Sequence, residues 1–143
     1  MNYLLDTCAV FELIKLEPQP EVVREIQAID NEALFLSVLT LGELEKGIAR
    51  LPHSKKKREL TLWLNQELIP AFEDRILYLN RAGARCWGQL QGQAFHRGQP
   101  LPVVDSMIAA VALVENLTVI TRNTRDLERC GVRVFDPWPK NDL

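Results

Sequence analysis

Short apolar runs alternate with longer stretches of mixed polarity along this chain. The apolar runs are short enough for strands, and they occupy residues 3–5, 33–38, 75–79, 118–121 and 132–135. Between them, apolar residues recur at intervals of three and four, which predicts helices over residues 9–16, 20–29, 40–51, 54–68, 80–97, 102–115 and 124–130. Strands separated by helices favour right-handed crossover units, so the pattern predicts an α/β fold with a parallel sheet.

Residues that favour helix ends support two of these boundaries. Asn80 is a good N-cap, and Gly98 fits just beyond the end of the helix that Asn80 opens. The sequence Thr40-Leu41-Gly42-Glu43 matches the capping box, in which a Glu three residues after the cap reaches back to the cap amide. This match predicts that Thr40 caps its helix and offers a structural explanation for Glu43.

The composition is that of a folded globular protein. The 143 residues suit one domain spanning residues 1–143, and the shares of 47% hydrophobic and 25% charged residues exclude a disordered chain. The longest uncharged apolar run, residues 107–114, is far shorter than the ~20 residues that a membrane helix needs. The first residues lack the pattern of a signal peptide, so we expect a cytoplasmic protein.

The three cysteines, Cys8, Cys86 and Cys130, show no CxxC spacing and have no histidine nearby in the sequence. Neither a zinc ribbon nor a disulfide framework is therefore predicted. We expect all three to be buried free thiols.

Acidic residues follow the ends of the predicted strands or begin the helices after them. Asp6 ends the first strand, while Glu43 and Asp105 fall in the first turns of two helices. Asn123 and Asp126 follow the fourth strand. Open parallel sheets bind ligands beyond the carboxyl ends of their strands, so we expect these side chains to converge there.

Most of these residues also have a purely structural explanation. Asp6 could cap the next helix, Glu43 could complete the capping box, and Asp126 could lie on the solvated face of a short helix. Asp105 is harder to explain in this way, because it is the only charged residue in the stretch 98–114. A lone carboxylate in a buried apolar helix is costly unless it is paired or bound to a metal.

A cluster of carboxylates must be protonated or neutralised by cations, because like charges repel. Oxygen ligands without His or Cys suit Mg²⁺ or Mn²⁺ and do not suit Zn²⁺. Pairs of such ions support phosphodiester hydrolysis. The sequence contains no Walker A motif, no GxGxxG and no GxSxG that would indicate a different chemistry.

Four motifs in order carry a resemblance to a known family: YLLDTCAV (3–10), LSVLTLGEL (36–44), PVVDSMIAA (102–110) and VITRNTRDL (119–127). They resemble the motifs of PIN domains, and within that family those of the VapC-type toxin ribonucleases. The chain departs from the pattern at Cys8, where the family usually has Asn or Ser. It departs again at Asp136-Pro137-Trp138, where the family typically has Asn-Pro-Trp.

The resemblance implies a three-layer α/β/α fold with a central parallel sheet. It also implies a Mg²⁺- or Mn²⁺-dependent endoribonuclease that acts as the toxin of a type II toxin–antitoxin system. The implied metal ligands and catalytic residues are Asp6, Glu43, Asp105 and, at a less certain fourth position, Asp126. Residues implied to support the ligands or to contact substrate are Thr7, Thr121, Asn123, Arg122 and Arg125.

The resemblance also implies partners: an RNA substrate, a VapB-type antitoxin, a second copy of the chain in a homodimer, and operator DNA only through the antitoxin. No membrane partner is expected. The basic run Lys55–Arg58 could contact phosphates or could be a solvated helix start. Two alternatives stay open at this point, namely a nuclease that acts on a substrate other than RNA and a PIN-fold binding module without catalysis.

Overall fold

The computed structural model describes residues 1–140, and the predicted domain of residues 1–143 includes three residues outside that range. Its centre is a five-stranded sheet in the order β3-β2-β1-β4-β5, in which every neighbouring pair is parallel. The strands are β1 (Tyr3–Leu5), β2 (Leu34–Ser37), β3 (Ile76–Leu77), β4 (Thr118–Ile120) and β5 (Val134–Phe135). The predicted parallel sheet is therefore confirmed.

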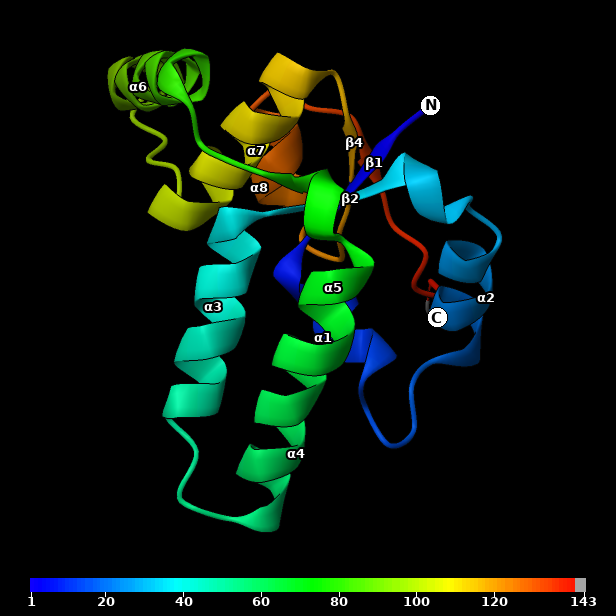
Figure 1. Ribbon diagram of the computed structural model, residues 1–143. Helices are drawn as coiled ribbons and strands as arrows, with labels where there is room; N and C mark the ends of the chain where they lie inside the picture. Colours follow the sequence, from blue (N-terminus) through cyan, green and yellow to red (C-terminus); the bar gives the residue numbers. More distant parts are fainter. Residues whose placement is uncertain (141–143) are drawn as a thin grey trace.

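Helices follow β1, β2, β3 and β4 (Figure 1). The α-helices are α1 (Thr7–Leu13), α2 (Pro20–Gln27), α3 (Val38–Ala49), α4 (Lys55–Trp63), α5 (Ile69–Ala71), α6 (Arg81–His96), α7 (Val103–Glu115) and α8 (Thr124–Arg129). A π-helical segment, η2 (Leu64–Leu68), joins α4 to α5, and short 3-10 turns, η1 (Asn31–Ala33) and η3 (Glu73–Arg75), precede β2 and β3. Figure 1 shows α3 and α4 side by side, projecting away from the sheet.

The two faces of the sheet bury different cores, because successive side chains of a strand point to opposite faces. Leu5 of β1 belongs to a cluster with residues of α1, α2 and α3. Leu4, its neighbour, belongs to a second cluster with residues of α7 and α8. Helices therefore cover both faces, and the predicted three-layer α/β/α arrangement is confirmed.

Two helices begin earlier than the sequence pattern predicts. α1 begins at Thr7, because the side chain of Asp6 accepts a hydrogen bond from the Thr7 backbone N–H at 2.8 Å. α3 begins at Val38, because Ser37 caps it by accepting a hydrogen bond from the Thr40 backbone N–H at 3.2 Å. The predicted capping box at Thr40 is therefore wrong, and Glu43 lies in the second turn of α3.

Other boundaries differ in smaller ways. The predicted helix over 54–68 is interrupted by the π-helical segment and continues to Ala71 as α5. The predicted strands over 75–79 and 132–135 keep only two residues each, at the two edges of the sheet. The cap at Asn80 is confirmed, since its side chain accepts from the Gly83 backbone N–H at 2.9 Å, and Gly98 adopts the left-handed φ of +65° that suits its position after α6.

A buried polar contact ties the end of the described chain to α1. Trp138 is 6% exposed, and its indole N–H donates to the carboxylate of Glu12, which is 3% exposed, at 3.0 Å. Glu12 also accepts from Lys15 at 3.1 Å and from the Gln19 backbone N–H at 3.3 Å. Burial alone would raise the pKa of Glu12, but the hydrogen bonds from Trp138 and Lys15 outweigh it and lower that pKa.

Within residues 1–140, none of the helices combines the length and the apolar character required to cross a membrane.

Candidate active site

The predicted site residues gather at one end of the sheet, beyond the carboxyl ends of β1, β2 and β4. An open cleft of about 370 Å³ lies there, and its walls are Asp6, Thr7, Cys8, Glu43, Asp105, Arg122 and Asn123. The three carboxylates come from the residue after β1, from α3 and from the first turn of α7. The parallel topology thus brings together residues that are far apart in the sequence, as the strand-end rule predicts.

Asp6 is held in place through both of its carboxylate oxygens. It is 5% exposed, and one oxygen accepts from the Thr7 backbone N–H at 2.8 Å. The other accepts from the Thr121 hydroxyl at 2.8 Å. Asp6 is therefore both a helix cap and a wall of the cleft, so the structural and the functional interpretations of this residue hold together.

Glu43 faces the cleft from the second turn of α3. Its carboxylate accepts a hydrogen bond from the Thr7 hydroxyl at 2.5 Å. The same hydroxyl lies 3.5 Å from the hydroxyl of Thr40. Thr7 thereby joins the start of α1 to α3 and holds the Glu43 carboxylate at the cleft.

Asp105 lies half-buried in the first turn of α7. Asn123 donates to its carboxylate at 3.0 Å. Burial, together with repulsion from Asp6, Glu43 and Asp126, raises the pKa of Asp105 to about 6. Burial and the nearby carboxylates therefore both favour the neutral form of Asp105.

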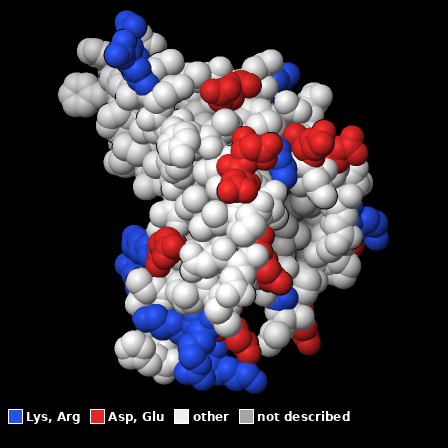
Figure 2. Space-filling model, viewed as in Figure 1, with Lys and Arg blue, Asp and Glu red and all other residues white. Residues whose placement is uncertain are grey.

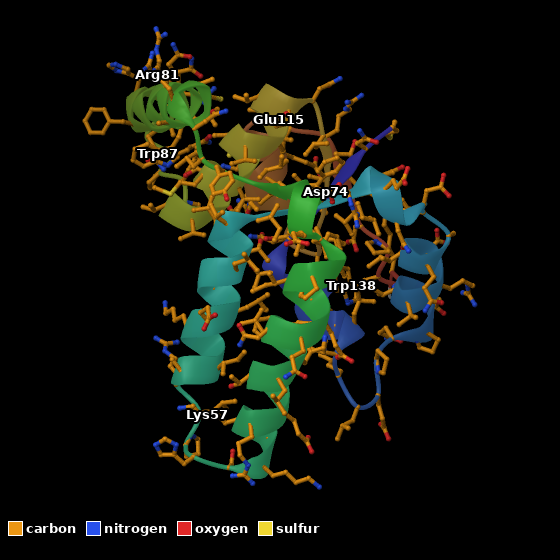
Figure 3. The ribbon with its side chains drawn as sticks, in the orientation of Figure 1. Lys57, Asp74, Arg81, Trp87, Glu115 and Trp138 are labelled. Carbon is orange, nitrogen blue, oxygen red and sulfur yellow. The ribbon has the colours of Figure 1, made fainter. Side chains whose placement is uncertain are left out.

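The start of α7 is fixed by a buried serine next to Asp105. The hydroxyl of Ser106 accepts from the Trp87 indole N–H at 3.0 Å and from the Gln91 amide at 2.8 Å, and both donors lie on α6. The hydroxyl donates to the Pro102 backbone carbonyl at 2.7 Å. Figure 3 shows Trp87 on α6. This network sets the position of the first turn that carries Asp105.

Asp126 lies at the edge of the site and is not a wall of the cleft. Asn123 also donates to Asp126, at 3.3 Å, and so lies between Asp126 and Asp105. The other Asp126 oxygen accepts from Arg129 at 3.2 Å. Arg125 is exposed and is likewise not a wall of the cleft.

Sequence reasoning missed two features of the site. Cys8, predicted as a buried core thiol, is only half-buried and lines the cleft, where it accepts from the Arg122 backbone N–H at 3.4 Å. The Arg122 guanidinium lies 5.9 Å from the ring centroid of Trp138, within the range of a cation–π contact. The position of Cys8, two residues after Asp6, was the available signal for the thiol; no local pattern links Arg122 to Trp138.

The donor set fits a hard divalent cation in its chemistry. Asp6, Glu43 and Asp105 offer only oxygen atoms, and none of the three forms an ion pair with a Lys or Arg of residues 1–140. In that same part of the chain, no three acidic, His or Cys side chains already stand close enough to hold a metal ion together. Each carboxylate is bound instead to a neutral donor, namely Thr121, Thr7 or Asn123.

Comparisons with known proteins agree with this geometry. The PIN domain family model matches residues 3–132. The chain is 36% identical to toxin FitB of Neisseria gonorrhoeae over 135 residues, covering 94% of this chain and 97% of FitB. It is 34% identical to VapC ribonuclease Y4jK of Sinorhizobium fredii over 135 residues, covering 94% and 96% of the two chains.

A solved structure shares the fold closely. The structure of FitAB bound to an IR36 DNA fragment contains a chain that matches with a TM-score of 0.90 and 32% identity, covering 98% of each chain. The similarity therefore extends over nearly the whole chain, well beyond the motifs around the acidic residues.

Proposed function

This chain belongs to the PIN domain family, and from that premise we propose that it is a metal-dependent endoribonuclease and the toxin of a type II toxin–antitoxin pair. The observation that carries the proposal is the cleft itself. Three carboxylates from separate elements face it. Burial and the acidic neighbours raise the pKa of Asp105 to about 6. Such a site gains stability by binding divalent cations.

In this proposal Asp6, Glu43 and Asp105 hold Mg²⁺ or Mn²⁺, with Asp126 at the edge of the same site. When bound, these ions supply an activated water and the charge stabilisation needed to hydrolyse a phosphodiester bond. Thr121 and Thr7 orient the carboxylates of Asp6 and Glu43 through the hydrogen bonds described above.

The most direct test is cleavage of total RNA and purified tRNA with Mg²⁺ or Mn²⁺ and with EDTA. We expect discrete products with 5′-phosphates, formed only with metal and absent with the Asp6→Asn variant. Asn caps helices about as well as Asp, so this variant should keep α1 and the fold intact. No cleavage by folded, antitoxin-free, metal-loaded protein would instead favour a binding module without catalysis, and cleavage of DNA alone would favour a different nuclease.

Asp126→Asn should reduce cleavage far less than substitution of the cleft carboxylates, by about 10-fold, as expected for a residue that supports the metal ligands from outside. The reason is that Asp126 is not a wall of the cleft and is already paired with Arg129. Initial rates at saturating metal, compared with those of Asp105→Asn, measure the difference. An equal loss in the two variants would assign Asp126 a full place among the metal ligands.

Arg122→Ala should raise KM for RNA about 10-fold and change kcat less, as expected when one charged phosphate contact is lost. Arg122 lines the cleft, and it is held over Trp138 without an ion pair to the carboxylates. Arg122→Lys should recover part of the affinity, because the charge remains while the planar group is lost. An unchanged KM in the Ala variant would exclude Arg122 from substrate binding.

The partners proposed for this chain are an RNA substrate, a VapB-type antitoxin, a second copy of the chain, and operator DNA reached through the antitoxin. The similarity to a chain of the DNA-bound FitAB structure, which covers 98% of both chains, supports a complex of this type. Arg125, exposed just beyond the cleft, is a further candidate for substrate contact.

A further inference from the structure

The connection between α3 and α4 carries a concentration of positive charge. Residues 50–58, here called the basic tip, contain Arg50, Lys55, Lys56, Lys57 and Arg58 and no acidic residue. The rest of the chain then has 12 Lys and Arg against 19 Asp and Glu, a charge of −7 against +5 at the tip. Figure 2 shows blue atoms gathered at this end of the molecule, which is the end of the α3–α4 projection in Figure 1.

The positive charge of the basic tip lies at the N-terminus of α4, where positive charge destabilises a helix. Lys55, Lys56 and Lys57 form the first turn of α4, whose backbone N–H groups make that end of the helix positive. The turn contains no acidic residue, and its cap is the uncharged Ser54. The basic residues therefore oppose the stability of α4, which indicates that they serve something other than the helix.

Only part of this charge is used by the fold. Lys57 donates to the backbone carbonyls of Leu51 at 3.1 Å and Ala49 at 3.5 Å, and so caps the end of α3. Lys55 lies 3.8 Å from Glu59 in an exposed pair. Lys56 and Arg58 are exposed, and their side chains form no ion pair or hydrogen bond within the described part of the chain.

The tip and the cleft are joined by a single helix. Glu43 lies on α3, and Arg50 is the residue at the end of this helix. The two positions are seven residues apart, which is about 10 Å along the helix axis. Stacked nucleotides advance about 3.4 Å each along the helix axis, so this span corresponds to about three stacked nucleotides.

We propose that the basic tip binds the phosphate backbone of the RNA substrate, about three stacked nucleotides from the bond that is cleaved. Lys56 and Arg58 make the contacts, while Lys57 holds the tip in shape. This inference rests on the proposed function, because it assigns the anionic partner as RNA. It predicts that the protein distinguishes long RNA from short RNA by affinity.

The test is the double variant Lys56→Glu/Arg58→Glu. Its matched control is Arg81→Glu/Arg85→Glu, which makes the same charge change near the start of α6, another helix whose first turn has no acidic residue. Both control residues are exposed, and Figure 3 shows Arg81 at the far end of the molecule from Lys57. Binding of a 24-nucleotide and a 4-nucleotide RNA is measured by fluorescence anisotropy in EDTA at several salt concentrations.

We expect the tip variant to bind the 24-nucleotide RNA at least about 10-fold more weakly, with the slope of log affinity against log salt reduced by about 1.4 for two lost contacts to a single strand. The loss should be smaller for the 4-nucleotide RNA, because it carries fewer phosphates and is too short to contact the tip and the cleft at the same time. Its melting temperature should equal or exceed that of the parent, because acidic residues suit the start of α4. A loss of affinity together with a gain of stability separates RNA binding from a structural role.

The inference is overturned if the control variant loses the same affinity, because net charge would then explain the effect. It is also overturned if the tip variant binds the long RNA as tightly as the parent does. If that variant instead loses binding to vesicles of anionic lipid, the partner of the tip is a lipid surface and the inference is wrong. Binding is measured without metal and cleavage with metal, so the two claims can fail separately. If the parent protein binds RNA at the tip but cleaves no RNA with metal, the proposed function is contradicted and the assignment of the tip still holds.

Discussion

An Asp105→Asn protein should cleave RNA at least about 1,000-fold more slowly than the parent, a loss of about 4 kcal/mol of transition-state stabilisation. Asp105 is one of three carboxylates facing the cleft, and burial together with its acidic neighbours raises its pKa to about 6. Asn keeps the shape and can still accept the hydrogen bond from Asn123, so the fold should be unaffected. Single-turnover cleavage with Mn²⁺ measures the rate, and circular dichroism checks the fold.

The same substitution should change how stability depends on pH when metal is removed by EDTA. The pKa of Asp105 is raised from 3.8 to about 6, so between these values the folded protein holds a proton that the unfolded chain releases. The free energy of unfolding of the parent should therefore fall as pH rises from about 4 to about 6. In Asp105→Asn this part of the slope should disappear, and the variant should be the more stable of the two at pH 7.

Urea unfolding of both proteins across that range measures this effect. Repeating it with saturating Mn²⁺ is the control, because a bound cation should offset the repulsion and restore stability at pH 7. A fully active Asp105→Asn protein, or one less stable than the parent in EDTA at pH 7, would contradict the role assigned to this carboxylate.

Trp138→Ala should lower the free energy of unfolding by about 3–5 kcal/mol. The indole is buried in the cluster that contains Leu5 and Val10, and its N–H is a hydrogen-bond partner of the buried Glu12 carboxylate. Removing the side chain leaves a cavity and takes a partner from a buried charge. Urea unfolding followed by circular dichroism measures the loss without relying on tryptophan fluorescence.

Two further substitutions separate the causes of this loss. Trp138→Phe keeps an aromatic ring in the cluster but removes the hydrogen bond to Glu12 and part of the indole, so about 1.5–3 kcal/mol should be lost. Phe95→Ala removes an aromatic side chain that is 81% exposed and should change stability by no more than about 0.5 kcal/mol. If Trp138→Ala behaved like Phe95→Ala, the tie between the end of the described chain and α1 would be energetically unimportant.

The arrangement of the sheet and the convergence of Asp6, Glu43 and Asp105 could be predicted from the sequence, because both depend on order along the chain. Alternating strands and helices dictate parallel strands, and parallel strands bring their carboxyl ends to one edge. The isolation of Asp105 in an apolar stretch was an equally strong signal, because burying an unpaired carboxylate is costly.

Local competition between neighbouring residues could not be predicted in the same way. Ser37 and Thr40 are both capable N-caps, and only the point where β2 ends decides in favour of Ser37. Arg122 and Trp138 are close together only because β4 and β5 are adjacent strands. Contacts of this kind depend on tertiary structure, and no pattern within one segment reports them.

The order of the strands has a consequence for the synthesis of this protein. β1 is made first, yet it lies in the middle of the sheet and pairs with β4, which is made more than 100 residues later. A ribosome that has reached residue 117 has already produced Asp6, Glu43 and Asp105, but neither Thr121, which holds Asp6, nor Trp138, which fastens α1. A prematurely terminated product therefore carries the three acidic residues without the scaffold that brings them together, and it should be harmless to the cell that makes it.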